Sequence, residues 1–66
     1  GTACLAVFDL AGRCVRRLEN PRPGAGIVEI RWDGRDDAGS PVISGVYVLR
    51  LTAGRATVSR RVTVVR

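Results

Sequence analysis

The sequence contains no histidine and no lysine, and it has only one tryptophan, one tyrosine and one phenylalanine. Without histidine it cannot form a Ser-His-Asp triad or the histidine-containing zinc sites. Without lysine it lacks the Schiff-base nucleophile and the lysine of phosphate-binding loops. No apolar run approaches the roughly 20 residues that a membrane-spanning helix requires. The composition therefore argues against an enzyme and predicts no cofactor, no metal site and no membrane span.

What the sequence does contain is typical of a small all-β domain. Valine, isoleucine and threonine, whose branched side chains favour strands, account for 17 of the 66 residues. Glycine and proline stand between the apolar runs rather than in one cluster. A chain of this length is interpreted as one domain spanning residues 1–66. Because it begins with Gly1 rather than methionine, we expect it to be a piece of a longer protein.

Alternating apolar residues predict five strands, two tight hairpins and no helix. Residues 19–26 and 33–41, which are rich in proline, glycine and aspartate, are interpreted as loops. The third strand has the clearest alternation and ends at Trp32, which we expect to be mostly buried. The expected strands are residues 5–9, 13–18, 28–32, 46–52 and 56–65.

A glycine sets the register of the first hairpin. Gly12 can take the left-handed conformation of a three-residue loop, which pairs Asp9 with Arg13. The same register pairs Phe8 with Cys14, and Val7 with Val15. Because Leu18 follows Val15 by three residues rather than two, a bulge or a strand end is expected at Leu18.

The second hairpin is expected at residues 53–55, which repeat the Ala-Gly-Arg of residues 11–13. Loops of two and of three residues both fit this turn, and they give Leu49 different partners. The register of the last strand therefore stays open.

The two cysteines are expected to be free thiols that serve as small apolar fillers. The predicted register places Cys14 opposite Phe8, four residues along the strand from Cys4. At about 3.3 Å per residue this offset is about 13 Å, beyond the reach of a disulfide.

Asp33, Asp36 and Asp37 form the only carboxylate cluster of the sequence. A calcium loop alternates oxygen ligands and places glycine sixth, whereas Arg35 and Ala38 occupy the third and sixth positions here. Three acids on one loop also cannot face each other across a cleft, as glycosidase carboxylates do. We interpret the cluster as a turn whose side chains cap backbone amides, with calcium binding as the alternative.

The formal net charge is +5, and all eleven basic residues are arginines. One interpretation is that they lie on solvated faces and protect the edges of a sheet. The alternative is a polyanion-binding face, for which the sequence lacks the interleaved aromatic residues of nucleic-acid binders. The candidates for such a face are Arg16, Arg17, Arg60, Arg61 and Arg66.

Three strings cover nearly the whole chain and together resemble one family: VFDLAGRCVRRL (7–18), GIVEIRWDGRDDAGSPVISGVYVLRL (26–51) and RRVTVVR (60–66). They are similar to the immunoglobulin-like domain of the flagellar hook-capping protein FlgD. They resemble still more closely the related C-terminal domains of exported bacterial proteins, including type IX secretion sorting domains. The residues that carry the resemblance are Phe8, Asp9, Gly12, Arg13, Trp32, Asp33, Gly34, Asp37, Gly39, Ser44, Gly45, Val46, Tyr47 and Arg61.

The resemblance implies a small antiparallel immunoglobulin-like β-sandwich of about five strands that lacks one or two N-terminal strands. It implies a non-catalytic C-terminal accessory domain of an exported bacterial protein, located outside the cell or on its outer surface. The domain would act as a sorting or docking module for secretion or surface attachment. The alternatives are a structural spacer or assembly domain of the hook-cap type, and an arginine-rich polyanion-binding module.

The expected partners are a protein of the secretion or cell-surface machinery and the upstream domain of the same polypeptide, with nucleic acid not favoured. An exposed final strand could be recognised through backbone pairing, with Arg60, Arg61 and Arg66 as the docking candidates. An incomplete sandwich also leaves open edges, so self-association is a further expectation to test.

Overall fold

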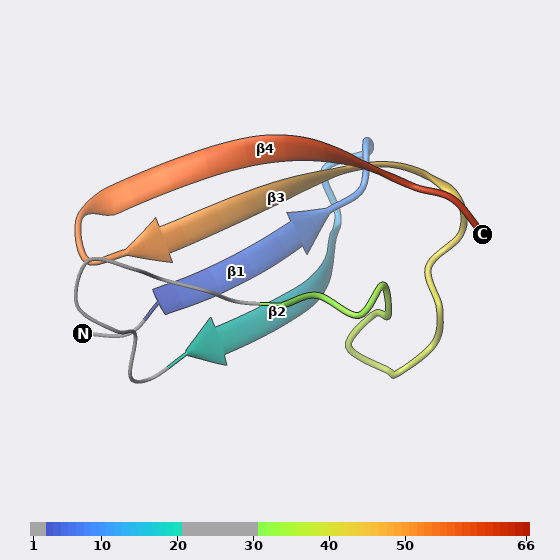
Figure 1. Cartoon of the computed structure of the whole chain (residues 1–66), viewed down its shortest axis with the longest axis horizontal. Helices are drawn as coiled ribbons and strands as arrows, with labels where there is room; N and C mark the ends of the chain where they lie inside the picture. The colour runs from blue at the N-terminus through green and yellow to red at the C-terminus, as the bar shows by residue number, and fades with distance from the viewer. Residues whose placement is uncertain (1–2, 21–30) are drawn as a thin grey trace.

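The structure, a computed structural model, describes residues 3–20 and 31–66, which form one antiparallel sheet (Figure 1). The order of its four strands across the sheet is β2-β1-β3-β4. No helix occurs in either described range, which confirms the all-β prediction. These ranges therefore contain no helix that is long and apolar enough to cross a membrane. The strands are β1 (Ala3–Phe8), β2 (Cys14–Asn20), β3 (Gly45–Ala53) and β4 (Ala56–Val64).

Four of the predicted strands are found, with ends that differ by one or two residues. β2 extends through Glu19 and Asn20, which were predicted to be in a loop, because they pair with Cys4 and Ala3 of β1. The predicted strand at 28–32 lies mostly outside the described residues, as does the rest of the loop at 19–26. Trp32, at the end of that predicted strand, is not in a strand.

The first hairpin has the predicted three-residue loop. The amide of Asp9 donates to the carbonyl of Arg13 at 3.0 Å, and the amide of Gly12 donates to the carbonyl of Asp9 at 3.0 Å. Gly12 has a φ of +86°, a left-handed conformation that a residue with a side chain rarely adopts. Phe8 pairs with Cys14 as predicted.

The predicted pairing of Val7 with Val15 is wrong, because a β-bulge intervenes there. Val7 pairs with Arg16, so the register shifts between Val7 and Phe8. Leu18 then lies opposite Leu5, and the apolar residues of the two strands share a face again. The break in alternation between Val15 and Leu18 was thus a real signal of a bulge, but the extra residue is Val15 rather than one next to Leu18.

The second hairpin has a two-residue loop, which settles the register that the sequence left open. Ala53 pairs with Ala56 across Gly54 and Arg55, and Gly54 has a φ of +59°. The repeated Ala-Gly-Arg triplet therefore forms different turns in the two hairpins, because in the first one Asp9 adds a side-chain acceptor. Leu49 pairs with Arg60.

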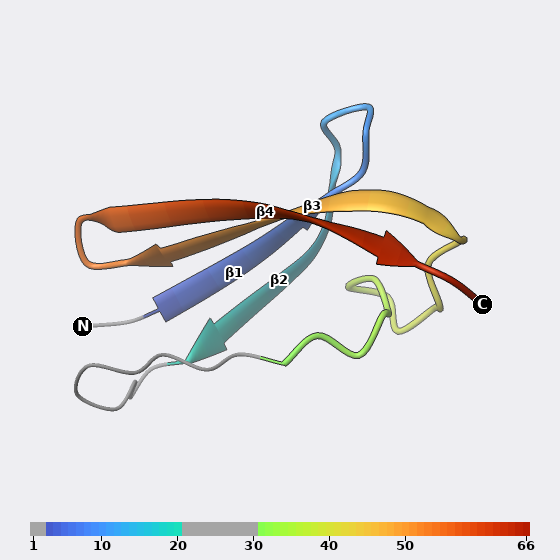
Figure 2. The same ribbon diagram turned by 45° about the horizontal axis from the view of Figure 1, so that its top comes forward.

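One face of the sheet, called the inner face below, carries the hydrophobic core. Leu5 and Val7 of β1 and Tyr47 of β3 are buried there, together with Val42 from the segment 31–44. Figure 2 shows this segment on one side of the sheet, between β2 and the start of β3. A second group of apolar residues is partly buried against this cluster: Val15, Leu18, Trp32, Leu49, Leu51, Val62 and Val64.

Tyr47 joins the sheet to the segment that covers it. Its ring is buried, with 5% of the residue exposed, and its hydroxyl donates to the carbonyl of Ile43 at 2.7 Å. A tyrosine near the start of a strand that bonds to the backbone a few residues upstream is the tyrosine corner of immunoglobulin-like domains. The contact fixes the direction in which the chain enters β3.

We expect the Tyr47→Phe variant to be less stable than the parent by about 1–2 kcal/mol, because the ring stays buried while the carbonyl of Ile43 loses its donor. Urea denaturation followed by tryptophan fluorescence measures the difference. A midpoint equal to that of the parent would show that the hydroxyl adds nothing to the corner.

Candidate functional site

The carboxylates of the loop at 33–41 are used to hold the loop. The Oδ1 atom of Asp33 accepts from the amide of Arg35 at 3.0 Å. The Oδ1 atom of Asp36 accepts from the amides of Ala38 at 3.0 Å and Ser40 at 2.9 Å. The prediction that these side chains cap backbone amides is confirmed. In residues 3–20 and 31–66 no three acidic, histidine or cysteine side chains form a group that could hold a metal ion.

Asp37 attaches this loop to the outer edge of β2. Its amide donates to the carbonyl of Val15 at 2.9 Å, and its Oδ1 atom accepts from the amide of Arg17 at 3.1 Å. Arg16 adds a hydrogen bond from Nη1 to the carbonyl of Asp36 at 2.7 Å. The bulged part of β2 is therefore covered along its edge by the loop.

Asp9 also accepts hydrogen bonds from backbone amides, in the first hairpin. Its Oδ1 atom accepts from the amides of Ala11 at 3.0 Å and Arg13 at 2.9 Å, and its Oδ2 atom lies 3.3 Å from Nε of Arg13. The hydrogen bond from the backbone of Arg13 is the main cause that lowers the pKa of Asp9 below its ordinary value of 3.8. All four described aspartates thus act on the backbone.

We expect the Asp9 carboxylate to stabilise the protein at neutral pH and to lose that effect in acid. Its folded-state pKa is lowered, so the stabilisation is fully present above about pH 4 and disappears as the pH falls through the lower, folded-state value. Thermal denaturation of the parent and of the Asp9→Asn variant measures this at a series of pH values. The difference in Tm should shrink below pH 4, and a constant difference would contradict the assignment.

We also expect calcium to leave the Tm of the protein unchanged at millimolar concentration, because the loop carboxylates accept amide hydrogens and Arg35 lies among them. Differential scanning fluorimetry with calcium, and with magnesium as the control, tests this. A rise in Tm with calcium alone would identify a cation site in the loop.

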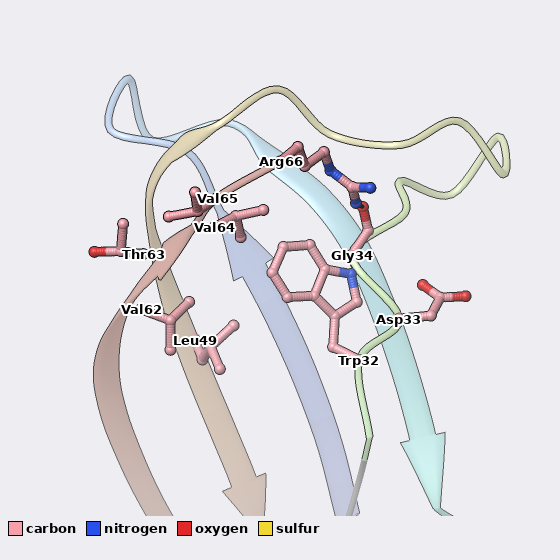
Figure 3. A pocket seen from close by; sticks show the side chains of 9 residues that line it. All are labelled: Trp32, Asp33, Gly34, Leu49, Val62, Thr63, Val64, Val65 and Arg66. Carbon is pink, nitrogen blue, oxygen red and sulfur yellow. Dashed lines mark hydrogen bonds between the residues drawn. The ribbon is translucent and has the colours of Figure 1, made fainter.

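An open pocket of about 540 Å³ lies where Trp32 faces β3 and β4 (Figure 3). Trp32 is half-buried rather than mostly buried as predicted, because one side of its ring borders this pocket. The ring meets that of Tyr47 edge-on, with centroids 5.7 Å apart, and its Nε1 donates to the carbonyl of Arg35 at 2.9 Å. Leu49 and Val62 form the opposite wall.

The end of the chain closes one side of this pocket. The guanidinium of Arg66 donates to the carbonyl of Gly34, and the amide of Arg66 donates to the hydroxyl of Ser44 at 3.1 Å. Gly34 has a φ of +76°, and a Cβ added there would lie 2.5 Å from Nη2 of Arg66. The left-handed conformation favours glycine at this position of the Trp-Asp-Gly motif, and a side chain there would also displace the guanidinium of Arg66.

Both cysteines are free. Cys14 pairs with Phe8 while Cys4 pairs with Glu19, which is the separation along β1 that the sequence predicted. Cys4 is half-buried, but Cys14 is exposed, so the interpretation of Cys14 as an apolar filler is wrong. The bulge follows directly after Cys14, whose Sγ atom donates to the carbonyl of Arg16 at 3.6 Å.

The structure does not bring the three docking candidates together. Arg60 pairs with Leu49 and shares the inner face with it, whereas Arg61 pairs with Val48 on the opposite, outer face. Arg66 is bonded to the loop. Of the other two polyanion candidates, Arg16 is held by the same loop and Arg17 is exposed on β2.

The residues of the sequence motifs gather at one end of the sheet. The first hairpin, the loop at 33–41, the start of β3 and the C-terminus all lie at this end (Figure 1). Each motif group serves a turn or a corner there. The residues concerned are Phe8, Asp9, Gly12, Arg13, Trp32, Asp33, Gly34, Asp37, Gly39, Gly45 and Tyr47.

The family model described as the FlgD Ig-like domain matches residues 1–57. The chain belongs to the FlgD Ig-like family. This is a family of structural domains, and the match supports the FlgD part of the resemblance but not the type IX sorting part. No curated protein and no solved structure matched the chain.

Two contacts of this FlgD Ig-like domain were not predicted. The bond from Tyr47 to Ile43 had a signal in the sequence, namely a tyrosine two residues after the Ser-Gly pair at the entry to β3. The bond from Arg66 to Gly34 had none, because it joins residues 32 positions apart.

Proposed function

We propose that this FlgD Ig-like domain is a non-catalytic assembly and spacer domain of an exported protein, as in the flagellar hook cap. It holds neighbouring domains or subunits in place through protein–protein contacts. It works outside the cell or at its outer surface, joined to an upstream domain of the same polypeptide.

The observation that carries this proposal is the use of the polar motif residues. Asp9, Asp33, Asp36 and Asp37 each accept backbone amides, so the carboxylates that could perform chemistry maintain turns instead. The net positive charge and the pocket beside Trp32 remain available for contacts with other molecules. This arrangement is typical of a scaffold domain, which acts through contacts of its surface rather than through a reacting group.

A sorting role is the second candidate. It is favoured by the position of Arg60 and Arg61 on β4, at the edge of the sheet, where a component of the secretion machinery could approach. Arg66 would take part only after leaving the carbonyl of Gly34.

A domain exchange tests the assembly role. The Ig-like domain of a FlgD protein in a motile bacterium is replaced by residues 1–66, and swimming and hook formation are compared with a strain in which that domain is deleted. We expect the exchange to restore motility and the deletion to abolish it. A chimaera that is exported and folded but forms no hooks would contradict the proposal.

The sorting role is tested with a reporter fused to the domain in a bacterium with a type IX system. Point substitutions suit this test better than removal of residues 60–66, because that deletion would take away Val62 and Val64, which pack against the core. If sorting is the function, Arg60→Gln with Arg61→Gln should retain the reporter in the cell. Equal export of parent and variant would reject the sorting role and leave the assembly role as the remaining candidate.

A further inference from the structure

The two edges of the described sheet differ in whether another segment covers them. The edge at β2 is covered by the loop, through the bonds of Asp37 to Val15 and Arg17. β4 forms the other edge, and within the described residues it pairs with β3 alone. A strand with an unpaired edge presents a row of backbone donors and acceptors that another extended chain can use.

The register of the second hairpin shows which groups point outward. Residues on either side of a two-residue loop form a hydrogen-bonded pair, and such pairs alternate along an antiparallel ladder. Ala53 and Ala56 are that first pair, so every second residue of β4 from Ala56 onward bonds to β3. The residues between them direct their amide and carbonyl groups away from β3: Thr57, Ser59, Arg61 and Thr63.

The net positive charge of the chain comes from the part of the sequence that includes this edge. All six acidic residues and six arginines precede Ala38, and the remaining five arginines follow it with no acid. The residues from 38 onward therefore carry the whole net charge of +5. Arg61 projects from the outer face of β4, and neither ion pair found among the described residues involves this half of the chain. An approaching strand with acidic side chains would meet uncompensated positive charge.

The pocket beside Trp32 opens along the same edge. Its wall includes Leu49, Val62 and Val64, whose side chains point toward Trp32, whereas that of Thr63 points away (Figure 3). A strand added to β4 would place every second side chain on the inner face, next to Val62. An apolar side chain at that place would enter the pocket and cover Val62.

We propose that the edge of β4 binds an extended, acidic segment of another protein, which adds a strand to the sheet. The segment places apolar side chains on the inner face, where the pocket takes one of them, and acidic side chains on the outer face near Arg61. Backbone bonds to the amide of Ser59 and to its outward-facing neighbours supply affinity, and the alternating pattern supplies specificity. The carbonyl of Ser59 accepts from Nη1 of Arg60 at 3.0 Å in the free chain, so a partner must displace that guanidinium to reach it. This inference deepens the proposed function and rests on it for the nature of the partner, a protein subunit.

A second copy of the chain fits this edge poorly. Two β4 strands paired antiparallel would bring Arg60 and Arg61 of each copy close to those of the other, because the arginines lie near the middle of the strand. Like charges at such positions are destabilising.

The probe for the test is a fluorescent, N-acetylated nine-residue peptide that alternates valine and glutamate. Its affinity for the 66-residue chain is measured by fluorescence anisotropy at low and at physiological salt. One control peptide has lysine in place of glutamate, and another keeps the composition but groups the glutamates at one end. A single-stranded oligonucleotide of equal charge represents nucleic acid. We expect only the alternating acidic peptide to bind.

Two variants of the chain separate backbone pairing from charge. Ser59→Pro removes an amide that points away from β3, a substitution that an edge strand tolerates, and it should abolish binding. Arg61→Gln should weaken binding about fivefold, whereas Arg17→Gln, which removes an exposed charge on β2, should leave it unchanged within about twofold. Circular dichroism verifies that each variant is folded.

Amide shifts in NMR spectra of the parent chain give a reading that needs no variant. Titration with the peptide should move the signals of Thr57, Ser59, Arg61 and Thr63 more than those of β2. The proposal would be overturned if the peptide does not bind, if the Ser59→Pro variant binds it equally well, or if Arg61→Gln and Arg17→Gln have equal effects. It would also be overturned if the oligonucleotide binds equally tightly or if the chain dimerises through β4.

This result is independent of the domain exchange. Peptide binding without restored motility would keep the strand-addition site and reject the hook-cap role. Restored motility without peptide binding would keep the hook-cap role and reject the strand-addition site.

Discussion

The inner face of a single sheet must be covered, and Tyr47 is the residue on which that cover depends. Its ring lies in the core with Leu5 and Val7 and meets the ring of Trp32 in a T-shaped arrangement, and its hydroxyl donates to the carbonyl of Ile43. The segment 31–44 is thereby fixed against the sheet, and Val42 fills the core. A sheet of four strands has no other described layer, so the local geometry of this segment decides how much apolar surface leaves water.

The sequence was sufficient to predict those features that depend on neighbouring residues. Alternation gave the positions of four strands, Gly12 gave the first loop, and aspartates in a glycine-rich segment gave the capped turns. Where two local solutions had similar energies, the sequence could not choose. Both loop lengths suited Gly54, and a bulge could be placed at several residues between Val15 and Leu18. Packing of Leu18 opposite Leu5 decides the second case.

The candidate site was harder to predict, because it is made by residues distant in the sequence. Arg60 and Arg61 were identified as exposed cations, but their placement on opposite faces followed only from the register of the second hairpin. Trp32 was assigned to the core on the pattern of residues 28–32, whereas its partial exposure comes from the position of β4 beside it. The contact of Arg66 with Gly34 joins the end of the chain to a loop, and no local pattern encodes it.

The separation of acidic and basic residues along the chain links the fold to its proposed use. Carboxylates are concentrated where turns need acceptors, in the first hairpin and the loop, and there they pair with backbone amides. Because no carboxylates remain for the hairpin of β3 and β4, its arginines keep their charge uncompensated within the described chain. The same charges hinder pairing of two identical edges and favour an acidic strand. Because the aspartates of the domain serve its turns, the edge of β4 keeps a positive charge that selects acidic strands, and no further residue is required for this selectivity.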